Sequence, residues 1–163
     1  MAHMDIGVDV EIQYWDAHTR IIKKHTKYCN VLTSIGIVNI LQWLANTKDL
    51  GNIDKIGVGS TGEIVPESIS NTGFGNALTG SNFTTESILE RNKAVTISNG
   101  IGTLIVSSVI APTEANNFTW NEILLFSADL TALARVVDKN PYPKTAESGA
   151  TIQWTITLQE TTK

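Results

Sequence analysis

The stretch that decides the fold is Asn117–Leu158, NFTWNEILLFSADLTALARVVDKNPYPKTAESGATIQWTITL. It contains three strand-like segments, NFTWNEILLF, ALARVVD and TIQWTITL, joined by short polar or proline-containing connections. Polar and apolar positions alternate in the first segment, and in the third segment Ile152, Trp154, Ile156 and Leu158 alternate with Thr and Gln. A period of two predicts a β-sheet with one packed face and one solvated face.

Upstream of this stretch, the sequence predicts an N-terminal β-hairpin. Residues Ile6–Tyr14 alternate in polarity, Asp16–Thr19 (DAHT) form a turn that Asp16 can start, and Arg20–Tyr28 return as a second strand. The returning strand carries a basic run made of Arg20, Lys23, Lys24 and Lys27. We interpret this run as a solvated or edge face, where charge discourages wrong strand pairing.

One helix is predicted, over about residues 33–46. Thr33 or Ser34 can cap its N-terminus. Its apolar stripe consists of Ile37, Ile40, Leu41 and Leu44, widened by Val38 and Trp43. Because so much of its circumference is apolar, we expect it to be buried on more than one side, against the sheet or a neighbouring subunit.

The middle of the chain alternates strands with one long loop. Ile53–Val58 reads as a short strand, and residues 59–82 form a loop rich in Gly, Ser, Thr and Asn that we expect to bind something or to reach a partner. Thr85–Ile110 reads as a long hairpin around Asn99–Gly100, a dipeptide suited to a type I′ turn.

Together these segments predict a mainly β fold, an antiparallel β-sandwich or barrel-like domain with one buried α-helix. A single β-rich domain over residues 5–163 accommodates all of them, and residues 1–4 (MAHM) are interpreted as a cloning remnant.

Composition excludes several classes of function. The net charge of −4 and the lack of a concentrated basic patch argue against nucleic-acid binding. No apolar run is long enough for a membrane span and no signal peptide is recognisable, so we expect a protein made in the cytoplasm without membrane association. Cys29 is the only cysteine, which excludes an intramolecular disulfide and predicts a buried thiol.

Motifs for catalysis or cofactors are weak. Gly57–Gly62 matches GxGxxG, but no helix pattern follows the last glycine as a phosphate site requires. His18 and His25 lack partners at helpful spacing, and the pair Glu86 and Glu90 is interpreted as solvated charge. We therefore predict no catalytic, cofactor-binding or metal-binding residues, and no enzyme.

The four tryptophans could form a platform for stacking sugars. Core packing is the more common role for Trp120 and Trp154, which lie on apolar strand faces, and for Trp43 in the helix. Only Trp15, beside the first turn, is considered for ligand contact.

The order of these motifs resembles tailed-bacteriophage and prophage virion proteins of the tail, fibre and baseplate region. The resemblance rests on NVLTSIGIVNILQWLAN, DKIGVGSTG, TWNEILLF, LARVVD and KTAESGATIQWTITL, which stand in that order from about Asp5 onward. Leu124 and Leu125 depart from the family, which more often has a small residue before the terminal aromatic. The resemblance implies a virion structural protein that forms a homo-oligomer, often a trimer, and attaches to other virion proteins.

Three functional hypotheses follow. The first is a phage tail, fibre or baseplate protein located in the virion and made in the host bacterial cytoplasm, with a capsid-decorating or head-attached role as its variant. The second is a receptor- or carbohydrate-binding module that contacts a host surface glycan through residues 59–82 and Trp15. The third and weakest is a small hydrolase, for which the chain offers no paired acid and base.

Overall fold

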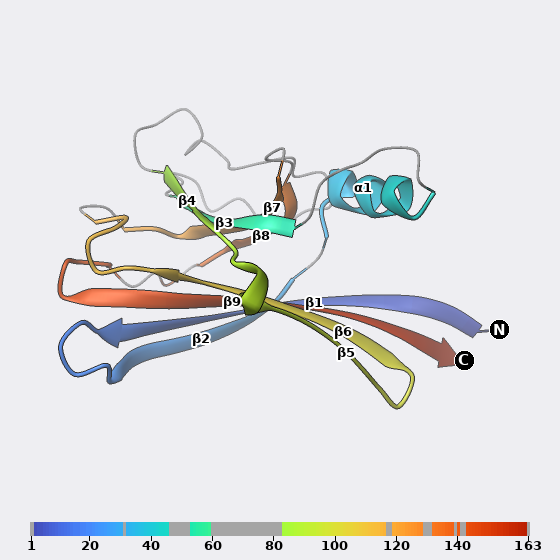
Figure 1. Cartoon of the computed structure of the whole chain (residues 1–163), viewed down its shortest axis with the longest axis horizontal. Helices are drawn as coiled ribbons and strands as arrows, with labels where there is room; N and C mark the ends of the chain where they lie inside the picture. Colours follow the sequence, from blue (N-terminus) through green and yellow to red (C-terminus); the bar gives the residue numbers. More distant parts are fainter. Residues whose placement is uncertain are drawn as a thin grey trace.

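The structure is a computed structural model, and it describes residues 2–30, 32–45, 53–59, 83–116, 119–128, 132–138, 140 and 143–162. Within these residues, two antiparallel sheets pack face to face, accompanied by one short α-helix (Figure 1). The mainly β, sandwich-like prediction is confirmed, and the sheets remain two separate layers rather than closing into a barrel. The loop predicted at 59–82 lies outside the described residues beyond Gly59.

The larger sheet has five strands in the order β2-β1-β9-β6-β5. Their bounds are β1 Ala2–Asp16, β2 Ile22–Asn30, β5 Lys93–Ser98, β6 Ile101–Ile110 and β9 Ser148–Thr162. The central strand β9 pairs with β1 along its whole length, from Thr162 opposite Ala2 to Ser148 opposite Asp16. The strand therefore begins at Ala2, inside the segment that the sequence analysis set aside.

Alternation along β9 is confirmed. Ile152, Trp154 and Ile156 are buried, whereas the threonines and glutamine between them are partly exposed. The predicted edge character of the basic run is also confirmed for Lys23, Lys24 and Lys27, because β2 is an edge strand.

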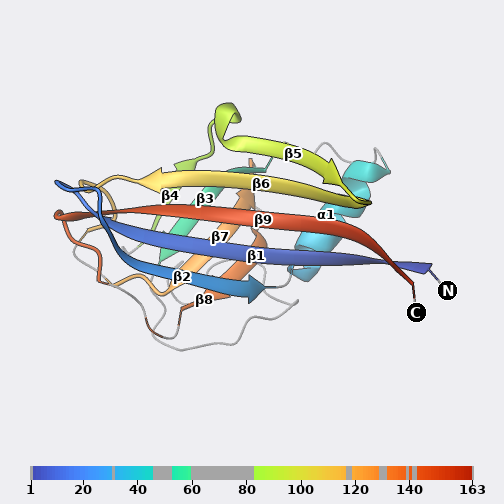
Figure 2. The ribbon, with the colours of Figure 1, turned by 90° about the horizontal axis from the view of Figure 1, so that it is seen from below.

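The smaller sheet has four strands in the order β4-β3-β7-β8. Their bounds are β3 Ile53–Gly59, β4 Phe83–Ser87, β7 Glu122–Ser127 and β8 Ala132–Val137. These strands run obliquely across those of the larger sheet (Figure 2). The predicted inward residues Ile56 and Val58 of β3 are fully buried.

The prediction of one solvated face is wrong for β7 and β8, where every residue is buried. Ile123 and Leu125 belong to the main core between the sheets, whereas Leu124 and Phe126 form a second apolar cluster with Ala132. The strands β7 and β8 are therefore covered on both faces, which is why they read as nearly continuous apolar runs.

The long hairpin predicted over Thr85–Ile110 is divided between the two sheets. Its first part, β4, pairs with β3, and the chain then crosses at the buried Ile88 and a 3-10 turn, η2 (Glu90–Asn92), into β5. The predicted type I′ turn is confirmed, since Asn99 and Gly100 have φ values of 50° and 77°.

The helix α1 covers Ser34–Leu44 and is capped by Thr33, as predicted. The hydroxyl of Thr33 accepts a hydrogen bond from the Gly36 amide at 2.9 Å and donates to the carbonyl of Ala132 at 2.6 Å. A Cβ at Gly36 would lie 2.4 Å from the carbonyl oxygen of Leu133. The helix therefore docks on β8 through its one glycine, with the two backbones in close contact.

Among the α1 side chains that the structure describes, burial on more than one side is not observed. Gly36 and Asn39 are buried against the sheet, whereas Ile37, Val38 and Leu41 are exposed. The docking face of the helix is its glycine face, so these three residues of the apolar stripe turn away from the sheet, whereas Ile40 packs against the core. The side chains of Trp43 and Leu44 lie outside the described part of the chain.

Candidate functional site

The two histidines singled out in the sequence contact surface carboxylates around the first hairpin. His18 Nε2 lies 2.8 Å from a carboxylate oxygen of Glu147, and His25 Nε2 lies 3.4 Å from one of Glu11. Each histidine therefore faces a different carboxylate. Gly62 and the side chains of Glu86 and Glu90 fall outside the described residues.

Cys29 is exposed, so the predicted buried thiol is wrong. The residue lies near the end of the edge strand β2, opposite Asp9 of β1. Asp9 is itself partly exposed, because this position belongs to the face of the larger sheet that points away from the core.

Trp15 does not offer an open stacking face. A Cβ at Gly149 would lie 2.2 Å from its ring, and the guanidinium carbon of Arg20 lies 4.3 Å from the ring centroid. Its indole N–H donates to Thr151 Oγ1 at 3.2 Å. The ring is thus packed between glycine backbone and arginine. Trp15 and Arg20 also line a pocket of about 340 Å³, so ligand contact at Trp15 stays a prediction. Trp120 and Trp154 are fully buried, as predicted.

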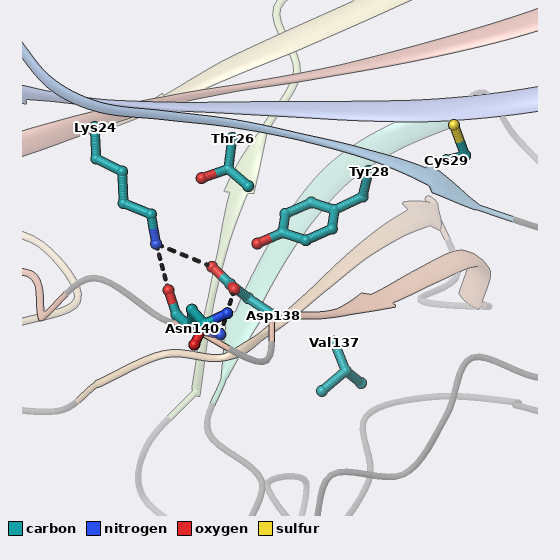
Figure 3. Close-up of a pocket in the computed structure, with 7 residues that line it drawn as sticks. All are labelled: Lys24, Thr26, Tyr28, Cys29, Val137, Asp138 and Asn140. Carbon is teal, nitrogen blue, oxygen red and sulfur yellow. Dashed lines mark hydrogen bonds and ion pairs between the residues drawn. The ribbon is translucent and has the colours of Figure 1, made fainter.

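A polar pocket of about 510 Å³ lies between β2 and the end of β8 (Figure 3). Lys24, Thr26 and Tyr28 line it from alternate positions of β2, and Asp138 and Asn140 line it from the segment after β8. This volume falls within the range of roughly 300–1,000 Å³ that is typical of small-molecule sites.

The centre of this polar pocket is Asp138, which is only 2% exposed. Its Oδ1 accepts a hydrogen bond from the Asn140 amide at 2.8 Å, and its Oδ2 lies 3.7 Å from the ammonium of Lys24. Lys24 also donates to the backbone carbonyl of Asn140. Among the described residues, neither Asp138 Oδ2 nor Thr26 Oγ1 has a hydrogen-bond partner, so the pocket presents two buried acceptors that a hydroxyl group could satisfy.

A second feature is apolar and lies at the end of the molecule that carries the chain termini. There the larger sheet extends past the smaller one, and α1 lies on the same side as the smaller sheet (Figures 1 and 2). One row of paired residues crosses four strands of the larger sheet, β1, β9, β6 and β5. In that order its members are Ile6, Leu158, Gly102 and Ile97.

This row continues the core-facing side of the larger sheet. The preceding row contains Val8 and Ile156, which are buried, but Ile6 and Leu158 are about half exposed because the smaller sheet no longer covers them. The exposed residues of α1 lie at the same end of the molecule (Figure 1), and we call the two groups together the apolar end. Its members are Ile6, Ile37, Val38, Leu41, Val95, Ile97 and Leu158.

The buried charged residue Lys144 lies away from both features. Lys144 donates to the carbonyls of Pro112 and Glu114, at 3.3 and 2.5 Å, and to Asn116 Oδ1 at 2.8 Å. Burial lowers the pKa of Lys144, although the charge of Glu114 acts in the opposite direction. Because Lys144 fastens the segment after β6, we assign it a structural role.

Shifted pKa values elsewhere belong to the first hairpin. Hydrogen bonds from the backbone N–H and the hydroxyl of Thr19 lower the pKa of Asp16 to about 2. A hydrogen bond to Glu11 and the charge of Asp9 raise the pKa of Lys27. These shifts reflect turn formation and cross-strand pairing.

No three His, Cys, Asp or Glu side chains gather in a metal-binding arrangement among the described residues. In the same part of the chain, no helix has the length and apolar character needed to cross a membrane.

Comparison of the chain with models of known protein families, with curated proteins and with solved structures finds no match.

Sequence reasoning missed both surface features. The polar pocket left a weak signal, the alternating Lys24, Thr26 and Tyr28, but their meeting with Asp138 depends on how the two sheets stack. The apolar end could not be recognised because a core-facing row looks the same in sequence whether or not another layer covers it.

Proposed function

We propose that the chain is a structural component of a tailed-phage or prophage virion, a tail, fibre or baseplate protein that acts by assembling with itself and docking to other virion proteins. It is synthesised in the host bacterial cytoplasm and acts in the virion. On this proposal it transforms no substrate. A capsid-decorating or head-attached protein is the variant of the same function.

The apolar end carries this proposal. Leu41 on α1 is 59% exposed and Ile97 on β5 is 81% exposed, and both lie in a surface of seven large apolar residues. Exposed apolar surface gathered at one end of a molecule is typical of an interface that another chain covers. The resemblance to virion proteins supplies the kind of partner, which is another copy of the chain or another virion protein.

Immunolabelling tests the location. Particles purified from the phage or prophage that encodes this chain would be labelled with antibody against it and viewed by electron microscopy. The expected result is label on the tail, fibre or baseplate, whereas label on the head would favour the capsid-decorating variant. Particles that are free of the chain would exclude a virion role.

A variant pair tests the apolar end itself. Leu41→Asp places a charge in this surface, and Val109→Asp changes a half-exposed residue of β6 elsewhere. We expect Leu41→Asp to reduce incorporation of the chain into particles and Val109→Asp to leave it unchanged. Equal incorporation of both variants would remove the apolar end from the proposal.

The polar pocket favours a second candidate, a receptor- or carbohydrate-binding module. The unsatisfied Oδ2 of Asp138 and hydroxyl of Thr26, beside the ring of Tyr28, suit a ligand with several hydroxyl groups. This candidate no longer depends on Trp15.

A glycan array with the intact protein tests the second candidate. Asp138→Asn should abolish any binding, while the matched change Asp9→Asn on the partly exposed opposite face should not. A blank array for the unmodified chain, or binding that survives Asp138→Asn, would reject the polar pocket as a glycan site.

A further inference from the structure

The two edges of the larger sheet are protected very differently. The edge strand β2 carries Lys23, Lys24, His25 and Lys27, and lysines on an edge discourage pairing with other chains. The opposite edge strand, β5, has the sequence KAVTIS, in which no charge and no proline follow Lys93. Within the described part of the chain, the same sheet therefore blocks one edge and leaves the other open.

The side chains of β5 are unusually exposed for their type. Val95 is 75% exposed and Ile97 is 81% exposed, and both lie on the core-facing side of the sheet, where β5 projects beyond the smaller sheet (Figure 2). Valine, isoleucine and threonine favour strands, so β5 is a well-formed and apolar edge that no other described strand covers.

The backbone of β5 also directs N–H and C=O groups away from β6, toward the free edge of the sheet. Asn99–Gly100 is a two-residue turn, so the flanking pair of Ser98 and Ile101 is hydrogen bonded across β5 and β6. Because hydrogen-bonded and non-hydrogen-bonded pairs alternate in an antiparallel ladder, Val95 and Ile97 direct their N–H and C=O groups toward the free edge.

We propose that β5 pairs antiparallel with β5 of a second copy of this chain. This inference rests on the proposed function, since it names the surface through which the chain assembles with itself. A two-fold axis at Thr96 would place Val95 opposite the partner's Ile97 and Ala94 opposite the partner's Ser98. The contact is isologous, and the two five-stranded sheets become one continuous sheet.

The position of Lys93 favours the register centred on Thr96, and it suits a second copy of this chain as the partner. With the axis at Thr96, Lys93 lies opposite the partner's Asn99, and the two lysines are at opposite ends of the contact. An axis at Val95 would place Lys93 opposite the partner's Ile97 and leave an ammonium beside apolar side chains. The strand is therefore complementary to itself in the register centred on Thr96, with no like charges opposed.

Native mass spectrometry and light scattering of the full chain at micromolar concentration test the pairing. The chain mass is 17.7 kDa, and we expect the unmodified protein at twice this mass. Ile97→Lys adds an edge charge, and Val95→Pro removes an amide that points away from β6, so both should halve the measured mass. Val109→Lys is the matched control, because Val109 is half exposed but lies on β6, inside the sheet.

Circular dichroism would establish that each variant remains folded. A dimer that becomes a folded monomer in both β5 variants but not in the control supports the pairing. An unmodified monomer or trimer, a complex that forms only with another virion protein, or a dimer insensitive to both β5 variants overturns it. Label on virions would still support the proposed function in these cases, so the two failures are distinguishable.

Discussion

The buried ion pair between Glu122 and Arg135 provides the sharpest test of how the smaller sheet is stabilised. The two residues lie on neighbouring strands β7 and β8 and are 0% and 2% exposed. Arg135 donates through Nε and also contacts the same carboxylate oxygen through Nη2. The prediction concerns Glu122→Leu, which removes the carboxylate but leaves the guanidinium in place.

The expected cost follows from burial. Arginine cannot lose its proton in a protein, so Glu122→Leu leaves a full positive charge in the core. Removing one partner of a buried pair costs about 3–5 kcal/mol of unfolding free energy. Replacing both, as in Glu122→Leu with Arg135→Met, should restore most of this loss because an apolar pair of similar volume can be neutral or stabilising.

Equilibrium unfolding in urea would measure the two single variants and the double variant, which together form a double-mutant cycle. The control is Glu11→Leu, which removes a partly exposed carboxylate that pairs with Lys27 and should have a much smaller effect. A Glu122→Leu variant that loses less than about 1 kcal/mol, well below the range for a buried pair, would refute the reasoning. So would a double variant as unstable as the sum of the single variants.

Three further predictions concern local structure. Gly36→Ala should destabilise the fold by about 1–3 kcal/mol, because the new methyl group meets the Leu133 carbonyl. This steric clash outweighs a gain in helix propensity of about 1 kcal/mol. A higher melting temperature for the variant would contradict the prediction. Asp16 should titrate near 2 by NMR. The ionised carboxylate therefore stabilises the folded state above its ordinary pKa of 3.8, and this stabilisation is lost as the pH falls through 2. Asp16→Asn should remove this pH dependence of stability, and a titration midpoint near 3.8 would count against the Thr19 hydrogen bonds. Lys144→Met should cost about 1–3 kcal/mol at neutral pH by leaving buried acceptors unmet. Because the folded pKa of Lys144 is lowered, the unfolded state binds more protons and the advantage of the unmodified chain should grow as the pH rises toward 10.5; denaturation midpoints that converge there would disprove it.

Local features were predictable from the sequence because a few neighbouring residues determine them. Positive φ at Asn99–Gly100 gives the hairpin turn, the carboxylate of Asp16 starts the first turn, and the hydroxyl of Thr33 caps α1. Alternation along Ile152–Ile156 also specified which side of β9 enters the core. Together these signals were sufficient for the β-sandwich class.

Exposure was decided only by the tertiary structure, because it depends on what covers a face rather than on the face itself. The apolar residues of β7 are buried on both sides, whereas those of β5 continue past the covering sheet and are open to solvent. Gly36 turns the glycine face of α1 toward β8, which exposes Leu41. Likewise, Lys24 and Asp138 form the polar pocket only because the edges of the two sheets meet. The two segments are more than a hundred residues apart in the chain, so no local sequence pattern predicts that they come together.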